Sequence, residues 1–184
     1  TKKTIFVVEA SSYQLAYSKH FKSKFSLIIN ISPDHLERHN TMKNYALSKL
    51  KCVTKQNEND IALIANNKLL KRLLRSKNIK SKLIFVSKNN YQTLTNKLNN
   101  NNFVNSANFQ NLNFLFELSK CMKLNLKTVL KTINNFKPLK FRQEVIYSKK
   151  YLKIVNDSKS TTLSSTTPFL ETNEKIFWIL GGLF

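Results

Sequence analysis

Short apolar runs alternate with amphipathic helical patterns along almost the whole chain, and this alternation constrains the fold more than any other feature. The runs are four or five residues long, the length of a buried strand. Strands that alternate with helices indicate an α/β fold with a mostly parallel sheet. The predicted strands are Ile5–Val8, Leu27–Ile31, Ile61–Ala65, Leu83–Val86, Glu144–Tyr147, Tyr151–Val155 and Ile176–Leu180. The predicted helices are Ser11–Phe21, Tyr45–Val53, Leu69–Arg75, Ala107–Met122, Leu126–Ile133 and Thr161–Leu170.

A domain boundary is predicted near residue 137. The helical pattern stops at 134–138, where the sequence reads Asn-Asn-Phe-Lys-Pro, because turn residues and a proline do not continue a helix. We therefore divide the chain into 1–137 and 138–184. The segment Asn96–Asn105 is rich in asparagine and low in complexity, so we expect it to be a surface loop.

The composition is typical of a folded protein in a reducing compartment. Hydrophobic residues make up 41% of the chain, enough for a packed core. The apolar runs are far shorter than the roughly 18–20 residues of a membrane-spanning helix, and the first residues lack the features of a signal peptide. Cys52 and Cys121 stand alone, so we interpret them as reduced core thiols. We expect a cytoplasmic protein with no membrane partner.

The formal net charge of +21 raises nucleic-acid binding as a different class of function. Only four of the 31 basic residues are arginine, and the lysines are spread almost evenly along the chain. Nucleic-acid-binding domains concentrate charge in one stripe and read bases with arginine. We therefore interpret the lysines as solvated surface residues and expect no nucleic-acid partner. Aromatic side chains clustered with lysines on a single face would favour the alternative.

Three of the ten carboxylates follow predicted strands: Glu9, Asp34 and Asp157. Open α/β sheets bind ligands at the carboxyl ends of their strands, where helix N-termini also gather. Each acid lies among other polar residues, and for any one of them a helix cap is the ordinary explanation. Three at equivalent strand ends favour a shared site with oxygen ligands for Mg²⁺ and cations for phosphate.

Six short blocks occur in order along nearly the whole chain: Glu9–Leu15, Asn30–His39, Tyr45–Lys49, Asn108–Asn111, Phe141–Val145 and Asn156–Thr161. The first two are similar to Glu-x-Ser-Ser-(Phe/Tyr)-Gln-Leu and Asn-x-x-x-Asp-His-(Leu/Met)-Asp-Arg-His. The others are similar to Tyr-x-x-x-Lys, Asn-x-x-Asn, His-Arg-x-Glu and Asn-Asp-Ser-Lys-Ala-Thr. These are motifs of the Mur ligases, and together the blocks resemble that family.

The resemblance implies a three-layer central ATP-binding domain, followed by the start of an α/β, Rossmann-like C-terminal domain. It implies a monomeric, ATP- and Mg²⁺-dependent ligase of peptidoglycan precursor synthesis. The Ser-Ser-Tyr-Gln-Leu segment favours the branch that adds D-glutamate to UDP-N-acetylmuramoyl-L-alanine. Another Mur-type or folylpolyglutamate-type ligase is the nearer alternative, and a basic nucleic-acid-binding α/β module is the alternative from a different class.

The resemblance also implies a role for individual residues. Glu9 and His35 would ligate Mg²⁺, and Lys49 would be carbamylated and help to hold a second Mg²⁺. The alternatives are that His35 is a loop histidine bonded to Asp34, and that Lys49 is an ordinary surface lysine. The implied nucleotide-binding residues are Asn108, Asn111, Arg142 and Asp157. Lys159 would approach the γ-phosphate, and the implied substrate-binding residues are Ser11, Gln14 and Thr161.

Some positions depart from the family pattern. Ala107 and Phe141 stand where histidine is usual, Thr162 where asparagine is frequent, and Glu37 where aspartate is usual. The only glycines are Gly181 and Gly182, so the Gly-x-x-x-x-Gly-Lys-(Ser/Thr) phosphate loop is absent from these 184 residues. The family carries that loop upstream of the Glu9 segment. We therefore expect partial domains at 1–137 and 138–184, and no catalysis by this chain alone.

Overall fold

The computed structural model describes residues 4–87, 90–100, 106–171 and 174–181. The chain forms two compact units, Thr1–Asn90 (unit 1) and Tyr91–Phe184 (unit 2). Unit 1 holds α1 Ser12–Tyr17, β1 Phe25–Ile28, α2 Leu36–His39, α3 Met42–Thr54, β2 Ile61–Ala65, α4 Lys68–Arg75 and β3 Lys82–Val86. Unit 2 holds α5 Gln92–Thr95, α6 Ser106–Cys121, α7 Leu126–Asn134, β4 Glu144–Lys149, β5 Leu152–Asn156 and α8 Leu163–Leu170.

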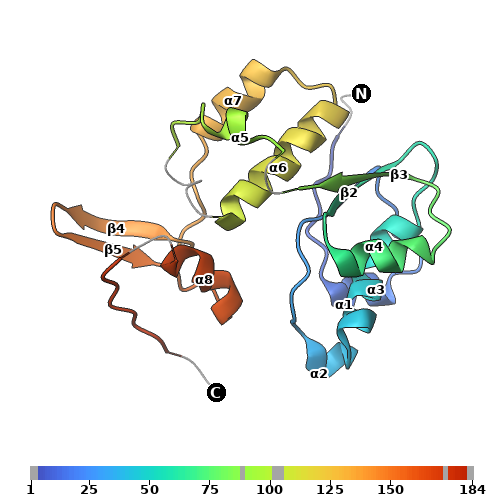
Figure 1. Ribbon diagram of the computed structural model, residues 1–184, viewed down its shortest axis with the longest axis horizontal. Coiled ribbons are helices and arrows are strands. Elements are labelled where there is room, and N and C mark those ends of the chain that lie inside the picture. Colours follow the sequence, from blue (N-terminus) through green and yellow to red (C-terminus); the bar gives the residue numbers. More distant parts are fainter. Residues whose placement is uncertain (1–3, 88–89, 101–105, 172–173, 182–184) are drawn as a thin grey trace. The chain divides into compact units, whose positions relative to one another are not determined.

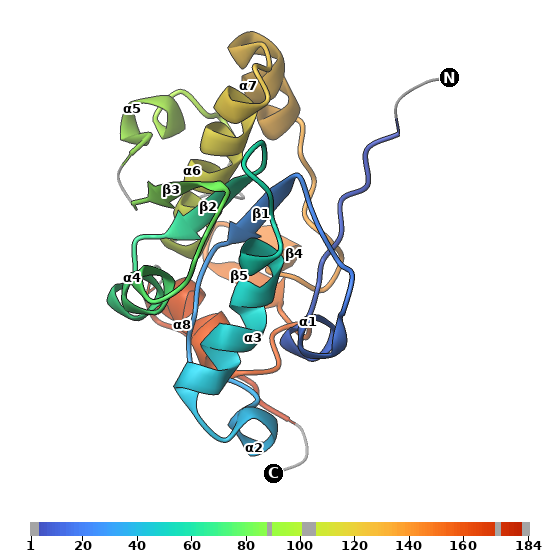
Figure 2. The same cartoon turned by 90° about the vertical axis from the view of Figure 1, so that its right-hand side faces the viewer.

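The strands of unit 1 form a parallel sheet in the order β1-β2-β3. Ile61 in β2 is opposite Phe25 in β1 and Lys82 in β3. Helices α3 and α4 make the two crossovers, and connections of the same hand in the same direction put both helices on one face. Figure 1 and the perpendicular view in Figure 2 show them there. The α/β class with a parallel sheet is thus confirmed.

The central strand and the helix after it form the core of unit 1. Ala62, Leu63 and Ile64 in β2 are fully buried. In α4, Leu70 and its neighbours at helical spacing are buried, while the arginines face solvent. The Asn67 side chain caps this helix by accepting from the backbone N–H groups of its first turn. Complete burial of a leucine contributes about 1.5–3 kcal/mol, so packing of this face holds α4 against the sheet.

A buried amide ties together the chain segments that lead into the sheet. Gln56 is 2% exposed, and its Nε2 donates to the carbonyl oxygens of Ser23 and Ile61, each at 3.0 Å. The backbone N–H of Ile61 also donates to the carbonyl of Lys24 at 2.9 Å. These bonds fix the starts of β1 and β2 side by side.

Helices α5, α6 and α7 in unit 2 share a small core. Its buried members are Leu112, Phe116, Val129 and Ile133, with Tyr91, Leu94, Leu98 and Leu130 packed against them. The predicted Asn-rich loop is confirmed for residues 96–100, which contain no strand and no helix, while 101–105 lie outside the described residues. The Asn100 amide donates to the carbonyls of Ile133 and Phe136, so the loop closes onto the end of α7.

An antiparallel hairpin of β4 and β5 follows, with a register shift between Val145 and Tyr147, and α8 comes after it. These elements confirm the predicted strands and helix in this region. The Rossmann-like arrangement is not confirmed, and the boundary near 137 stays a prediction.

Two predicted strands are wrong. Ile5–Val8 and Ile176–Leu180 are neither strand nor helix, and their side chains are mostly exposed, with Val7 and Ile179 each at 94%. An apolar run becomes a strand only where a neighbouring strand completes its hydrogen bonds, and neither run has such a neighbour among the described residues. The equivalent strand-end positions expected for the three acids are therefore also wrong, because Glu9 follows no strand and Asp157 follows an antiparallel one.

The remaining expectations from composition have mixed outcomes. Cys52 is buried, whereas Cys121 is only half-buried. Burial raises the pKa of the Cys52 thiol above its ordinary value. Within the part of the chain that the structure describes, no helix has the length and apolar character needed to cross a bilayer.

Candidate functional site

The start of α1 is closed by a reciprocal pair of hydrogen bonds between Ser11 and Gln14. The Ser11 hydroxyl accepts from the backbone N–H of Gln14 at 3.2 Å, and Gln14 Oε1 accepts from the backbone N–H of Ser11 at 2.8 Å. This capping box satisfies two groups that a helix otherwise leaves unpaired. Both residues are exposed. They therefore stabilise the helix, and their binding of substrate stays a prediction.

A tight turn presents the His35 imidazole. The single helical turn α2 lies between His35 and Asn40, whose φ angles are 53° and 61°. Left-handed backbone costs an ordinary residue roughly 1–2 kcal/mol, and such strain is found most often at functional sites. The backbone N–H of His35 donates to Asp34 Oδ1 at 3.0 Å, which helps to hold the turn.

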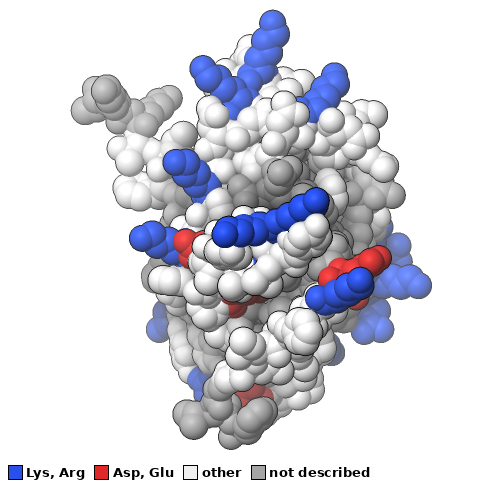
Figure 3. Space-filling model, turned by 90° about the vertical axis from the view of Figure 1, so that its left-hand side faces the viewer, with Lys and Arg blue, Asp and Glu red and all other residues white. Residues whose placement is uncertain are grey.

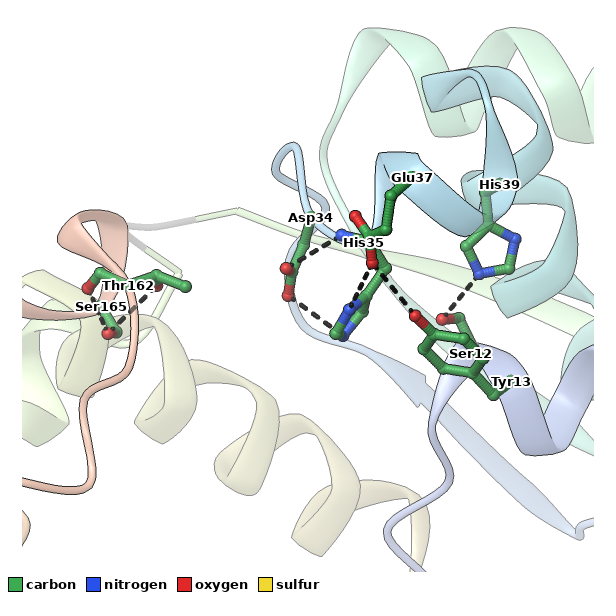
Figure 4. Close-up of polar contacts among 8 residues, drawn as sticks. All are labelled: Ser12, Tyr13, Asp34, His35, Glu37, His39, Thr162 and Ser165. Atoms are coloured by element: carbon green, nitrogen blue, oxygen red, sulfur yellow. Dashed lines mark hydrogen bonds and ion pairs between the residues drawn. The ribbon is translucent and has the colours of Figure 1, made fainter. Parts of the chain in front are cut away.

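Carboxylates lie on both sides of the His35 ring, as Figure 4 shows. Nε2 is 3.4 Å from Asp34 Oδ2, and Nδ1 is 3.7 Å from Glu37 Oε1. The His35 side chain is 43% exposed, so these attractions are screened by solvent. The Asp34 contact is the one expected of a purely structural loop histidine. The exposure leaves the same ring available to a ligand.

Two tyrosine rings surround His35 and His39. The Tyr13 centroid is 5.0 Å from that of His35 and 5.6 Å from that of His39. The Tyr45 centroid is 6.5 Å from His35 and 5.4 Å from His39. The Tyr13 hydroxyl donates to Glu37 at 3.3 Å. Two causes raise the pKa of Tyr13: loss of hydration is the larger, and the nearby Glu37 carboxylate is the second. We call Tyr13, His35, His39 and Tyr45 the ring cluster.

Lys49 reaches the same cluster from α3. Its Nζ is 5.0 Å from the centroid of Tyr45, which is one helical turn earlier. A lysine cation over an aromatic face is attracted by the ring quadrupole. The structure therefore brings His35 and Lys49 to one aromatic ring.

Two acidic side chains beside His35 are of the kind that Mg²⁺ takes as ligands. Asp34 and Glu37 offer carboxylate oxygens, and Mg²⁺ in phosphate sites is held by one or two carboxylates rather than by a complete protein cage. No group of three His, Cys, Asp or Glu side chains, among those the structure describes, is arranged to hold a metal. Glu9 lies in the exposed segment before α1, and its convergence with His35 and Lys49 stays a prediction.

In unit 2, Asp157 joins two loops. Its Oδ1 accepts from the backbone N–H of Gln143 at 3.0 Å, and its Oδ2 accepts from the Ser160 hydroxyl at 2.8 Å. The backbone N–H of Lys159 donates to the Phe141 carbonyl at 3.0 Å. These bonds place the loop around 142 against the loop around 158.

Arg142 and Lys159 therefore project from neighbouring loops, and both side chains are exposed. Thr161 is exposed just before α8. Asn108 and Asn111 lie three residues apart near the start of α6, so they share a side of that helix. The structure thus brings the loops that carry Arg142, Asp157 and Lys159 together, whereas the binding roles of all six residues stay predictions.

His39 is a buried residue of this site whose role the sequence pattern did not indicate. It is 8% exposed, with Nε2 3.0 Å from Ser12 Oγ and Nδ1 3.4 Å from Ser48 Oγ. Its place at the end of the Asn30–His39 block was the one available signal. Tyr13 and Tyr45 also lie within matched blocks without having been given a role.

Charge is dispersed on the face drawn in Figure 3, where lysine and arginine side chains are scattered with acidic side chains between them. That distribution is typical of a solvated surface. A different pattern occurs at the β4–β5 turn, where Lys149 lies 5.8 Å from the Tyr147 ring centroid and Lys150 lies 5.4 Å from that of Tyr151.

Comparison with known proteins identifies a family for this chain. Residues 1–134 match the family model described as the Mur ligase middle domain. The D-glutamate ligase of UDP-N-acetylmuramoylalanine from Elusimicrobium minutum is 32% identical over 97% of this chain and 43% of its own length. The enzymes of the same name from Rickettsia felis and Fusobacterium nucleatum are 28% and 30% identical, over 97% and 95% of this chain.

The chain spans less than half the length of these relatives, 43–44%. The matched blocks, the parallel sheet and the family model all agree with a Mur ligase middle domain. The match to the family model covers most of the chain. The chain belongs to the Mur ligase family, and residues 1–134 correspond to its middle domain.

Proposed function

We propose that this chain is part of an ATP-dependent ligase that adds D-glutamate to UDP-N-acetylmuramoyl-L-alanine in the cytoplasm. The relatives that it matches carry the name of that ligase. The observation that carries the proposal is the meeting of His35 and Lys49 at the Tyr45 ring, with carboxylates beside His35. Such a group of side chains suits metal-assisted phosphate chemistry.

The proposed reaction has two steps. A carboxylate oxygen of the muramoyl-alanine attacks the γ-phosphorus of ATP, which gives an acyl phosphate and ADP. The amine nitrogen of D-glutamate then attacks the acyl carbon, the bond between that carbon and the phosphate oxygen breaks, and the amine loses a proton. The products are the amide and inorganic phosphate. Mg²⁺, when bound, would neutralise charge on the phosphate oxygens.

The residues of this chain would act chiefly by position and charge. Glu9 and His35 would ligate Mg²⁺. Lys49 would do so as a carbamate, because a carbamate offers anionic oxygens whereas an ammonium repels the ion. Arg142 and Lys159 would bring positive charge to the nucleotide phosphates.

The remaining roles concern the nucleotide and the amino-acid substrate. Asn108 and Asn111 would contact adenine or ribose, and Asp157 would hold the Arg142 loop in place while it contacts the nucleotide. Ser11, Gln14 and Thr161 would contact substrate. Each of these assignments rests on the match between a block of this sequence and the family motif.

The proposal is tested in the full-length protein that contains this chain. Phosphate release should require ATP, Mg²⁺, UDP-N-acetylmuramoyl-L-alanine and D-glutamate together. His35→Ala should lower kcat by about 10²-fold or more, because the residue would act in positioning and charge stabilisation. His20→Ala, which removes an exposed histidine of the same unit, is the matched control. Release that proceeds with a folate or another amino acid in place of these substrates would assign the chain to a sibling ligase.

The nucleic-acid alternative has one observation in its favour, the pairs of lysine and tyrosine at the β4–β5 turn. Stacking aromatics beside cations are features of single-strand binding sites. Binding of a labelled oligonucleotide that weakens steeply with salt, and that Tyr151→Ala abolishes, would support this function. We expect no such binding at physiological salt.

A further inference from the structure

His39 connects three helices of unit 1. Its ring belongs to α2, Ser12 belongs to α1 and Ser48 belongs to α3. Nε2 is 3.0 Å from Ser12 Oγ, and Nδ1 is 3.4 Å from Ser48 Oγ. The imidazole is 8% exposed and Ser12 is 2% exposed, so water cannot readily replace these partners.

The partners of Ser48 define the tautomer of the ring. The Ser48 hydroxyl has one hydrogen, and it donates that hydrogen to the backbone carbonyl of Asn44 at 3.0 Å. Toward His39 Nδ1 the same oxygen is therefore an acceptor, and Nδ1 carries the proton. In the neutral imidazole, Nε2 is then an acceptor and receives the Ser12 hydroxyl. Each hydrogen bond has one direction, so the ring has one orientation.

The residues bonded to His39 are adjacent to residues of the candidate site. Ser12 follows the cap Ser11 and precedes Tyr13, while Ser48 precedes Lys49. The His39 ring also packs against both tyrosines that contact His35. Loss of His39 would therefore remove one hydrogen bond from α2 to α1 and one from α2 to α3, next to the two rings that lie between His39 and His35.

We propose that His39 is a positioning residue, which as the Nδ1–H tautomer holds α1, α2 and α3 together so that His35 and Lys49 face the Tyr45 ring. The link to metal binding rests on the function proposed above. The link to the orientation of His35 does not, because it depends only on contacts within unit 1.

The first test measures the tautomer of His39 and the ring signals of His35 by NMR of the full-length protein labelled with ¹⁵N-histidine. Long-range ¹H–¹⁵N spectra should show His39 as the Nδ1–H tautomer, and His39→Ala should shift the ring signals of His35. Val86→Ala, a core truncation in β3 at a residue 3% exposed, is the control for general destabilisation and should leave them in place. An Nε2–H tautomer, or His35 signals that His39→Ala does not move more than the control does, would overturn the proposal.

The second test measures the Mg²⁺ concentration that gives half-maximal ligase activity, well below the unfolding temperature. His39→Ala should raise it about tenfold or more, as loss of groups that orient metal ligands does, whereas Val86→Ala should not. His39→Gln, whose amide oxygen can stand near the position of Nε2 and accept from the Ser12 hydroxyl, should recover part of the loss. An unchanged Mg²⁺ requirement in active His39→Ala protein would refute positioning of the metal site. A wild-type protein without ligase activity, whose His35 signals still respond to His39→Ala, would refute the proposed function alone.

Discussion

The Lys49 ammonium lies over the ring of Tyr45, 5.0 Å from its centroid and one turn further along α3. The ring quadrupole attracts a cation placed over its face, and the Tyr45 ring is only 5% exposed. Carbamylation needs the neutral amine and would replace this cation with an anion. The two states of Lys49 therefore interact differently with the same ring, and chemistry at this lysine is open to direct test.

Lys49→Ala in the full-length protein should be nearly inactive, and added acetate should restore part of the activity, because a short carboxylate supplies the oxygens that the carbamate would provide. Lys49→Arg should be inactive with or without acetate, since its charge is permanent and positive. Phosphate release measures both. Lys43→Ala, at an exposed lysine of the same helix, is the control. Full activity of Lys49→Arg would make Lys49 an ordinary surface lysine.

Ser11 can be assigned to helix capping or to substrate binding by two substitutions. Ser11→Ala removes the cap and should lower the free energy of unfolding by about 1 kcal/mol. Ser11→Asp keeps a capping oxygen but changes size and charge, so it should retain stability while the KM for the UDP-linked substrate rises. Urea unfolding and steady-state kinetics separate the two effects. An unchanged KM in Ser11→Asp would leave only the capping role.

Gln56→Leu should destabilise unit 1 strongly. The leucine fills similar space but leaves the carbonyls of Ser23 and Ile61 without the donor that now lies 3.0 Å from each. A buried group left unpaired costs about 1–3 kcal/mol. Gln92→Leu, the same change at an exposed position, should leave the urea midpoint almost unchanged. Similar midpoints for the two variants would mean that the Gln56 bonds contribute nothing to stability.

Tyr91 should make stability fall at alkaline pH. Two causes raise the pKa of Tyr91 in the folded state: burial of its ring is the larger, and its hydrogen bond to Glu117 is the second. The unfolded chain ionises this tyrosine near pH 10, so the stabilisation is complete below that pH and declines above it. Between about pH 8 and pH 11 the free energy of unfolding should therefore fall more in the wild type than in Tyr91→Phe. Tyr151→Phe, at a residue 90% exposed, should follow the wild type.

How well a strand could be predicted depended on whether the folded chain supplies its neighbours. Ile61–Ala65 was predicted with its observed bounds, because it is the central strand and is paired on both sides. Ile5–Val8 is also apolar yet is exposed and forms no strand, because an apolar run does not specify the neighbouring strand that would pair with it. The hairpin was predicted as two strands, whereas its antiparallel pairing could not be read from two short runs.

In the candidate site, some residues could be identified from the sequence and others only from the folded chain. His35 and Lys49 could be named because they occupy matched blocks of sequence. His39 could not be given a role, because its partners are 27 and 9 residues away and a buried histidine has no local pattern. Ser11 was placed correctly at the start of a helix, but only the folded chain shows that Gln14 completes the cap.

The left-handed backbone at both ends of α2 sets a rule for which substitutions the turn accepts. In a saturation library selected only for folded protein, glycine and aspartate should be enriched at Asn40, whose φ is 61°, while valine and isoleucine should disappear. Glycine should also survive at His35, where φ is 53°. A second selection for activity would then remove glycine from position 35 and keep it at position 40. The difference between the two surviving populations would distinguish the residue required by its side chain from the one required by its backbone.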